Sequence, residues 1–326
     1  MKITVIGGLN VDIGCVSLNA VRRADSNPAR VRMSAGGVGR NIAENLLRLG
    51  ADTAFISAAG DDGFASFLRE RMAVIGLDSS RLIVRRGMST GLYVLILEPA
   101  GELFTAVNDM EAVESITPAD LEPFKKTVTA SDLAVLDANL LPETLEAAVR
   151  IAGGVPLMAD AVSAEKAKRL AGILPRLAIL KTNRAEAEAL AGFPVDTEKN
   201  LRECCRILLG AGLGEIHITL GKDGYCCASK DGVFIQPALP VKLMDVNGAG
   251  DAYTAGAARH FCAAGREHGT PPGAPHASDA AARGLFGAAC AAITSEHPGA
   301  VYDELTAEKV RERITSQKNG ESNERV

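Results

Sequence analysis

Residues 245–251 of the chain read DVNGAGD and lead directly into a helix-like run. The small residues Gly248, Ala249 and Gly250 let the backbone turn sharply and bring its N–H groups close to a ligand. A helix that begins at such a turn offers unpaired N–H donors and the positive end of its dipole, which together favour a phosphate. Asp251 adds a carboxylate beside this anion hole, and a general base for a hydroxyl that receives a phosphoryl group would explain it. An ordinary acidic residue in a first helical turn is the alternative.

Outward from this loop, short apolar strands alternate with helices that end at glycine. We expect strands at 3–7, 53–57, 133–136, 157–160, 178–181 and 215–220. We expect helices at 38–49, 62–75, 142–151, 184–190 and 201–209. The alternation predicts an α/β fold with a doubly wound, mainly parallel sheet whose faces are both covered. Ligands of such sheets bind beyond the carboxyl ends of the strands.

Two regions break this alternation. Half-polar, strand-like runs occupy about 13–33 and 88–110, and a turn at 99–102 makes a hairpin of the second region. No helices cover these runs, so we interpret them as a small β-sheet lid over the site. A homodimer through the lid is the alternative use of their apolar face. We expect one domain at 1–315, which includes the lid, and a polar C-terminal tail at 316–326.

Composition excludes several classes of protein. Of the 326 residues, 47% are hydrophobic and 23% charged, which is ordinary for a globular protein. The net charge of −5 and the absence of Trp argue against nucleic acid as a partner. No apolar run approaches the length of a membrane span, and the first residues read as a strand and not as a signal peptide. We therefore expect a cytoplasmic protein with a small-molecule substrate and no membrane contact.

Two polar clusters follow the first part of this pattern. Asn10 and Asp12 come after the first strand, where an amide and a carboxylate suit a sugar diol. A turn stabilised by these two side chains is the alternative. Gly36 and Gly37 open a helix and permit close backbone approach to a ribose, and Asn41 lies one turn further along the same face. The spacing of these glycines is not that of a dinucleotide-binding motif.

Two further clusters lie in the second half of the chain. Asn183 and Glu186 share a helix face and suit a hydrated Mg²⁺, which takes one or two carboxylates together with phosphates and water. An N-cap Asn with Glu three residues later is the alternative, and locally the more common arrangement. Thr219, Gly221 and Gly224 follow a buried strand, where the glycines either admit a nucleotide or form a hairpin.

The order and placement of these motifs resemble the ribokinase-like carbohydrate kinase family, also called PfkB, from about residue 2 to about residue 305. The resemblance implies a doubly wound sheet with a β lid, and transfer of a phosphoryl group from ATP to a sugar or nucleoside hydroxyl. It implies Asp251 as the base and the N–H groups of residues 248–250 as the anion hole. Some members use a monovalent cation near this loop, where Thr usually stands in place of Asn247, so K⁺ is a further candidate cofactor.

The same resemblance implies roles for the other clusters. Asn183 and Glu186 would order Mg²⁺ and phosphate, and Asn183 would also contact the nucleotide beside the cluster at 219–224. The clusters at 10–12 and 36–41 would hold the ribose.

Four less widely shared strings are similar to those of family members that phosphorylate pseudouridine. They are ADSNP at 24–28, GGVGRNIAENL at 36–46, VNDM at 107–110 and DAVSA at 160–164. The last string has Ala161 where we associate Pro with those members. Pseudouridine carries a ring N–H that uridine lacks, and a buried acceptor facing it would reject uridine.

The lid holds four residues that can accept this hydrogen bond: Asp25, Asn27, Asn108 and Asp109. A polar lid turn is the alternative for each of them. The expected product is pseudouridine 5′-phosphate. A kinase for another sugar or nucleoside is the first alternative, and Arg22, Arg23, Arg30 and Arg32 of the lid keep a phosphosugar open. A non-catalytic nucleotide- or sugar-sensing module is the second.

Overall fold

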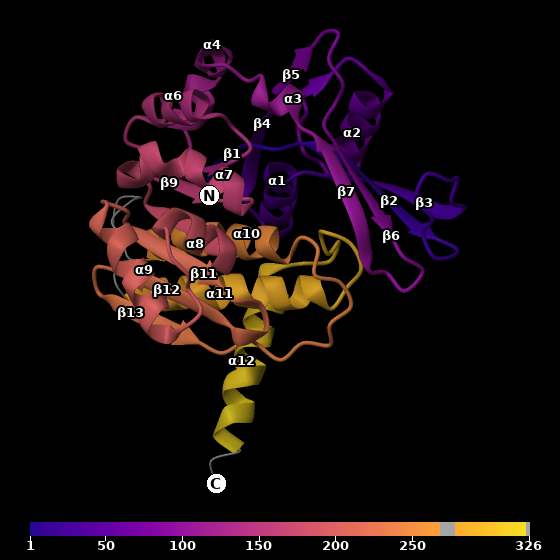
Figure 1. The fold of residues 1–326 in the computed structure, drawn as a ribbon. Coiled ribbons are helices and arrows are strands. Elements are labelled where there is room, and N and C mark those ends of the chain that lie inside the picture. Colours follow the sequence, from indigo (N-terminus) through magenta and orange to yellow (C-terminus); the bar gives the residue numbers. More distant parts are fainter. Residues whose placement is uncertain (268–277, 324–326) are drawn as a thin grey trace.

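The computed structural model describes residues 1–267 and 278–323 and contains a large sheet with helices on both faces (Figure 1). Its nine strands lie in the order β13-β12-β11-β10-β9-β8-β1-β4-β5. They are β1 (Lys2–Ile6), β4 (Asp52–Gly60), β5 (Leu82–Arg85), β8 (Leu133–Asp137), β9 (Leu157–Asp160), β10 (Ile179–Asn183), β11 (Glu215–Thr219), β12 (Tyr225–Ser229) and β13 (Gly232–Gln236). All neighbours from β11 to β5 pair in parallel, so the predicted doubly wound, mainly parallel sheet is confirmed.

Alternating side chains of the strands feed two apolar cores, one on each face of the sheet. In β8, Leu133 and Val135 enter one core, and Ala134 and Leu136 the other. The first core contains α1 (Val38–Arg48), α2 (Gly63–Val74), α10 (Ala249–Glu267), α11 (Ser278–Ser295) and α12 (Ala307–Asn323). The second lies under α3 (Glu111–Glu114), α4 (Pro118–Leu121), α5 (Lys125–Thr129), α6 (Pro142–Ala152), α7 (Ala164–Ala167), α8 (Arg184–Ala191) and α9 (Glu198–Gly210).

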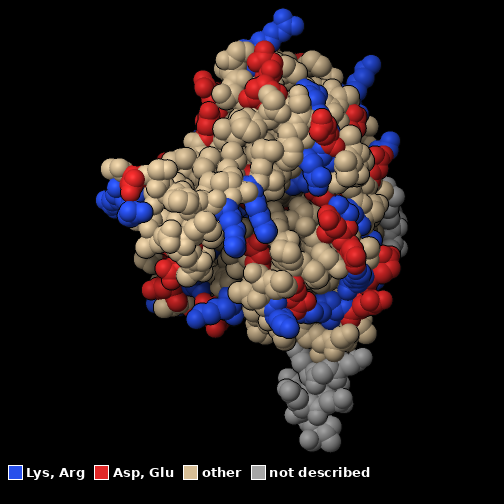
Figure 2. Space-filling model, turned by 90° about the vertical axis from the view of Figure 1, so that its right-hand side faces the viewer, with Lys and Arg blue, Asp and Glu red and all other residues tan. Residues whose placement is uncertain are grey.

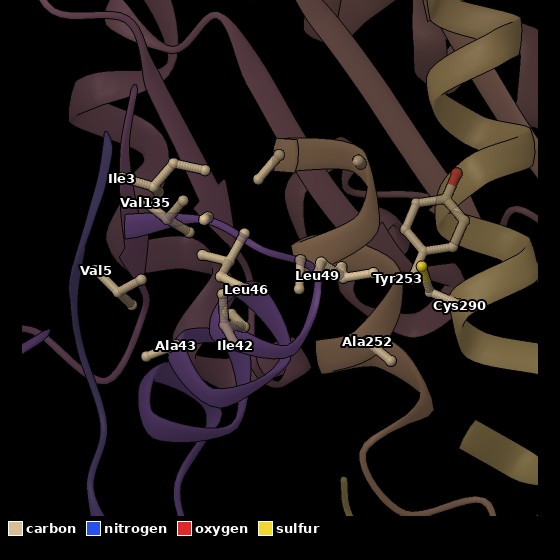
Figure 3. Packing of buried hydrophobic residues seen from close by; sticks show 14 of the residues in the cluster. Ile3, Val5, Ile42, Ala43, Leu46, Leu49, Val135, Ala252, Tyr253 and Cys290 are labelled. Atoms are coloured by element: carbon tan, nitrogen blue, oxygen red, sulfur yellow. The ribbon is translucent and has the colours of Figure 1, made fainter. Parts of the chain in front are cut away.

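Helices α1 and α10 pack against each other over the middle of the sheet. Ile42 and Leu46 of α1 and Leu49, the residue after its last turn, recur at helical spacing and are fully or almost fully buried. Figure 3 shows them between Val135 of the sheet and Ala252 of α10. This packing fixes the first turn of α1 beside the first turn of α10.

A separate four-stranded sheet has the order β3-β2-β6-β7 and projects to one side of the molecule (Figure 1). Its strands are β2 (Asn10–Ser17), β3 (Ala29–Gly36), β6 (Leu92–Leu97) and β7 (Leu103–Asp109). The two regions predicted from half-polar runs therefore do form one small sheet, and the hairpin between β6 and β7 is present. Strand β2 begins at Asn10 and β3 ends at Gly36, so this half of the sheet extends beyond the predicted range of 13–33.

Three features differ from the expected pattern. After β11 the chain returns as the antiparallel hairpin β12–β13, and β5 adds an edge strand on the other side. Residues 316–323, expected as part of a polar tail, are the last turns of α12, and residues 324–326 lie outside the described part of the chain. No helix among the described residues is long and apolar enough to cross a membrane.

Candidate active site

The loop before α10 can be built only with glycine at its turning point. Gly248 has φ +70°, and a Cβ there would collide with the carbonyl oxygen of Ala300. A Cβ on Gly250 would lie 2.8 Å from Nζ of Lys181, so this ammonium group sits directly against the loop. Ala249 begins the 19-residue helix α10, whose N-terminal N–H groups and dipole favour an anion at this point.

Asp251 lies in the first turn of α10 with 9% of its surface exposed. Its Oδ2 accepts a hydrogen bond of 2.8 Å from Nδ2 of Asn41 on α1. Burial, and after it the nearby Asp160 carboxylate, raises the pKa of Asp251 from 3.8 to about 7. A carboxylate with this pKa can accept a proton near neutral pH, as a general base must.

Charged side chains that sequence reasoning did not assign lie beneath the loop, at the carboxyl ends of β8 and β9 and in the middle of β10. Asp137 is in register with Asp160, and Asp160 with Lys181. The Lys181 ammonium is 3.2 Å from Asp160 Oδ2, which also accepts 2.7 Å from Thr254 of α10. Burial raises the pKa of Asp137 to about 6. The signal that could have revealed this row was a charged residue at or next to the end of three successive expected strands, 133–136, 157–160 and 178–181.

A cavity of about 370 Å³ adjoins the other side of the loop. Thr219, Gly221 and Gly224, predicted for the nucleotide, all line it, together with Ala249 and Gly250. The two glycines also have positive φ angles and form the turn from β11 to β12. The hairpin interpretation is therefore confirmed, and contact with a nucleotide stays a prediction. The cavity thus reaches the N-terminus of α10, one residue away from the buried carboxylate.

Asn183 and Glu186 form the capping box of α8. Asn183 Oδ1 accepts 2.9 Å from the Glu186 N–H, and Glu186 Oε2 accepts 2.8 Å from the Asn183 N–H. The local alternative to a metal site is therefore present. No group of three or more His, Cys, Asp or Glu within the described ranges is arranged to hold a metal ion. A Mg²⁺ ion that keeps its water and binds phosphate oxygens needs only one protein carboxylate, and the buried Glu186 fits that requirement.

The predicted sugar-binding residues meet where the small sheet joins the large one. Asn10 donates 2.6 Å to Asp12 Oδ1, and burial raises the pKa of Asp12. A Cβ on Gly36 would collide with the Asp12 carboxylate, and Gly37, with φ +100°, would meet the Gly8 carbonyl oxygen at 2.5 Å. Gly36 therefore leaves room for the Asp12 carboxylate and Gly37 for the neighbouring backbone, and the predicted close approach to a ribose stays a prediction.

The four residues predicted to read the base are separated by the small sheet. Asp12 is in register with Tyr93, and Tyr93 with Asn108, so these three side chains share one face. Asp109 follows on the opposite face and accepts 3.0 Å from the Glu111 N–H.

Asp25 and Asn27 lie in the connection between β2 and β3, at the end of the hairpin remote from Asn10. An eight-residue strand such as β2 spans about 23 Å. Asn27 accepts 2.8 Å from the Arg22 N–H and donates 2.9 Å to the Arg22 carbonyl, so it closes a turn. Within one chain the structure does not bring this pair to Asp12.

Comparison with known proteins gives consistent relatives. A model of the pfkB family carbohydrate kinases matches residues 1–307. The chain is 31% identical over 258 residues to the pseudouridine kinase of Escherichia coli strain K12, covering 78% of this chain and 82% of that protein. It is 31% identical to the structure of a carbohydrate kinase from Agrobacterium tumefaciens, with TM-score 0.80 and coverage of 96% and 97%.

A more distant structure shares the fold. Arabidopsis thaliana ribokinase complexed with ribose and ATP has TM-score 0.79 at 19% identity, with coverage of 96% and 98%. The predicted ribokinase-like α/β architecture is confirmed.

Proposed function

Because the chain belongs to the pfkB family of carbohydrate kinases, and is a sugar or nucleoside kinase, we propose that it phosphorylates the 5′-hydroxyl of pseudouridine with ATP. Asp251 takes the proton of that hydroxyl as the new O–P bond forms, and the bond from the γ-phosphorus to the ADP oxygen breaks. The products are pseudouridine 5′-phosphate and ADP.

One observation carries the chemistry. A buried carboxylate whose pKa is raised to about 7 stands at the N-terminus of α10, next to Gly250 of the cavity wall. It is also hydrogen-bonded to Asn41, whose neighbour Arg40 contacts β3 of the small sheet. A nucleotide in the cavity and a sugar beside Asp12 would meet at this point. The helix N-terminus then stabilises charge on the transferring phosphoryl group.

The residues around the loop suit ATP and Mg²⁺ as cofactors. The cavity is lined mainly by apolar and small residues, which suit an adenine ring and leave room for the phosphates. Mg²⁺ bound near Glu186 supplies charge neutralisation for the phosphates. K⁺ is proposed as a further cofactor near Asn247, and its test is turnover in potassium-free buffer with and without added KCl.

Recognition of a nucleoside is supported by the row of side chains on the small sheet. Tyr93, which sequence reasoning missed, lies between Asp12 and Asn108 in register and offers an aromatic face for stacking a base. Asn108 lies two strands, about 10 Å, from Asp12, and its amide oxygen can accept the extra ring N–H of pseudouridine. We therefore place base recognition at Asn108 before Asp25, Asn27 or Asp109.

A phosphosugar is the second candidate substrate because of two arginines. Arg32 is in register with Gly14 and Arg30 with Val16, so both share the face of Asp12. Figure 2, a view of the molecule from the side of the small sheet, shows Lys and Arg side chains, together with acidic ones, around a hollow near the middle of the molecule. The guanidinium groups of Arg30 and Arg32 would pair with the phosphate of such a substrate.

The opposite face of the small sheet suits a homodimer. It carries the exposed apolar side chains Val31, Met33 and Val107, which alternate with the polar ones. Dimerisation through the lid is thus part of the proposal, and sedimentation velocity measures it.

The test of the proposed function is an ADP-release assay with Mg-ATP and equal concentrations of pseudouridine, uridine, ribose, adenosine and fructose 6-phosphate. Turnover with pseudouridine well above uridine supports the proposal. A preference for fructose 6-phosphate or another sugar would replace pseudouridine as the proposed substrate and keep Asp251 as the proposed base. ATP binding without turnover of any acceptor favours a sensing module. The control is Asp251→Asn, expected to lower kcat at least ~10²-fold.

A further inference from the structure

Arg40 is a buried guanidinium in the first turn of α1, and its contacts converge on the site. It is 8% exposed, and its Nη1 donates 2.7 Å to Oδ1 of Asn41 and 3.0 Å to the carbonyl of Ala35 in β3. Its Nη2 pairs with Glu44. Its Nε–H has no hydrogen-bond partner in the described part of the chain. Because Nε makes no hydrogen bond to any described residue, the contacts of Nη1 and Nη2 alone orient the guanidinium.

The contact with Asn41 decides which end of the amide faces Asp251. An amide has an acceptor oxygen and a donor nitrogen, and only the nitrogen can stabilise a carboxylate. Because the Arg40 cation occupies Oδ1, Nδ2 is left to donate to Asp251 Oδ2 at 2.8 Å. A flipped amide would place Oδ1 against the carboxylate and Nδ2 against the guanidinium, which is repulsive at both ends.

We propose that Arg40 is a positioning residue that locks the Asn41 amide so that it holds the Asp251 carboxylate for catalysis. The inference rests on the proposed role of Asp251 as the base. Its bond to the Ala35 carbonyl also ties this lock to strand β3 of the small sheet. Arg40 therefore acts on the reaction through Asn41, without contact to the reacting atoms.

Arg48 provides a matched control on the same helix. Its guanidinium also pairs with Glu44, at 2.9 Å, and it contacts Asp303, but none of its hydrogen bonds reaches Asn41. Like Arg40→Met, Arg48→Met removes one positive charge and one of the two arginines that pair with Glu44. It should leave kcat unchanged.

The test is a double-mutant cycle of Arg40→Met and Asn41→Ala, with kcat and KM measured in the ADP-release assay using whichever acceptor the wild-type chain turns over. We expect Arg40→Met to lower kcat about tenfold or more, the loss of one hydrogen bond to a charged group, with little change in KM for ATP. The double variant should be no slower than Asn41→Ala alone. Arg40→Lys keeps the charge but has a single ammonium group in place of the two Nη groups, so its kcat should lie between those of the wild type and Arg40→Met.

A pH profile separates this lock from a purely structural role. Both single variants remove the bond that lowers the pKa of Asp251, so the acidic limb of kcat should move to higher pH by a similar amount. Asp160, Lys181 and Asp137 also face Asp251 and are unchanged in every variant. If the Arg40 charge acts on Asp251 through space, Arg40→Met should still shift the pH profile in the Asn41→Ala background. If Arg40 acts only by orienting Asn41, the substitution should cause no further shift there.

The outcomes distinguish this inference from the function on which it rests. If Arg40→Met lowers kcat by the same factor in the wild-type and Asn41→Ala backgrounds, the role of Arg40 is overturned. The same follows if its kcat equals that of Arg48→Met. In either case an inactive Asp251→Asn variant still supports Asp251 as the base. Near-normal turnover of Asp251→Asn overturns the proposed function itself. Thermal unfolding of each variant, read by circular dichroism, identifies a folding defect. If Arg40→Met unfolds, the Arg40→Lys cycle decides by the same criterion.

Discussion

Asp251→Asn should make the folded protein more stable at neutral pH while it removes activity. The pKa of Asp251 rises from 3.8 to about 7 on folding, mainly because the carboxylate is buried. Above pH 7 the carboxylate is ionised in both the folded and unfolded states, and the folded state bears the full cost of burying the charge. Three pKa units correspond to about 4 kcal/mol. The Asn side chain carries no charge and can still accept the hydrogen bond from Asn41.

The sign of the pH dependence follows from the raised pKa. Between pH 7 and about pH 4 the folded state keeps its proton and the unfolded state does not, so the cost to the wild type falls as the pH falls. The gain in unfolding free energy from Asp251→Asn should therefore be about 4 kcal/mol at pH 8 and about 2 kcal/mol at pH 5.5.

Urea unfolding of both proteins at the two pH values measures this gain, and the difference between variants cancels other titrating groups. Asp52→Asn, at an exposed site, is the control and should change the free energy by less than about 0.5 kcal/mol. A gain that is absent, or that is the same at both pH values, would refute the argument that burial raises this pKa.

Three further predictions concern the same site. The kcat/KM of the wild type should fall about tenfold per pH unit below about pH 7 as Asp251 becomes protonated, and a flat pH-rate profile down to pH 5 would contradict its role as base. Gly248→Ala should abolish turnover because its Cβ meets a backbone carbonyl, whereas Gly299→Ala, with φ +92° and open space, should cost only about 1–2 kcal/mol in urea unfolding and retain kcat. Lys181→Met leaves the buried Asp160 without its cation and should lower the unfolding free energy by about 3–5 kcal/mol, so unchanged stability in urea would show that another group compensates this carboxylate.

The sequence was sufficient for features encoded by local periodicity. Strand β9 was expected at 157–160 and lies at Leu157–Asp160, and α1 was expected at 38–49 and lies at Val38–Arg48. The glycine loop before Asp251 was equally legible, because a turn that excludes Cβ atoms demands glycine. A hairpin at 219–224 was one of two alternatives, but strands β12 and β13 themselves were not among the expected strands.

What local patterns could not provide was register between distant strands. Tyr93 joins Asp12 and Asn108 only because β2 aligns in register with the distant hairpin β6–β7. Arg40 is adjacent in sequence to the predicted Asn41. Its proposed role, however, depends on its hydrogen bonds to the Ala35 carbonyl of β3 and to the Asn41 side chain, which the sequence does not reveal. Asn183 and Glu186 show the reverse case, because their spacing suits both a helix cap and a metal: the structure contains the cap, and the Mg²⁺ role stays a prediction.

The central place of β1 has a consequence for synthesis of the chain. This first strand is flanked by β4 and β8, and Ile3 pairs with Leu133, which is made 130 residues later. At the usual pace of translation that interval is on the order of ten seconds, during which one hydrogen-bonding edge of an apolar strand has no native neighbour. Nascent chains that end before β8 therefore expose an unpaired strand edge, which can pair with another chain and lead to aggregation.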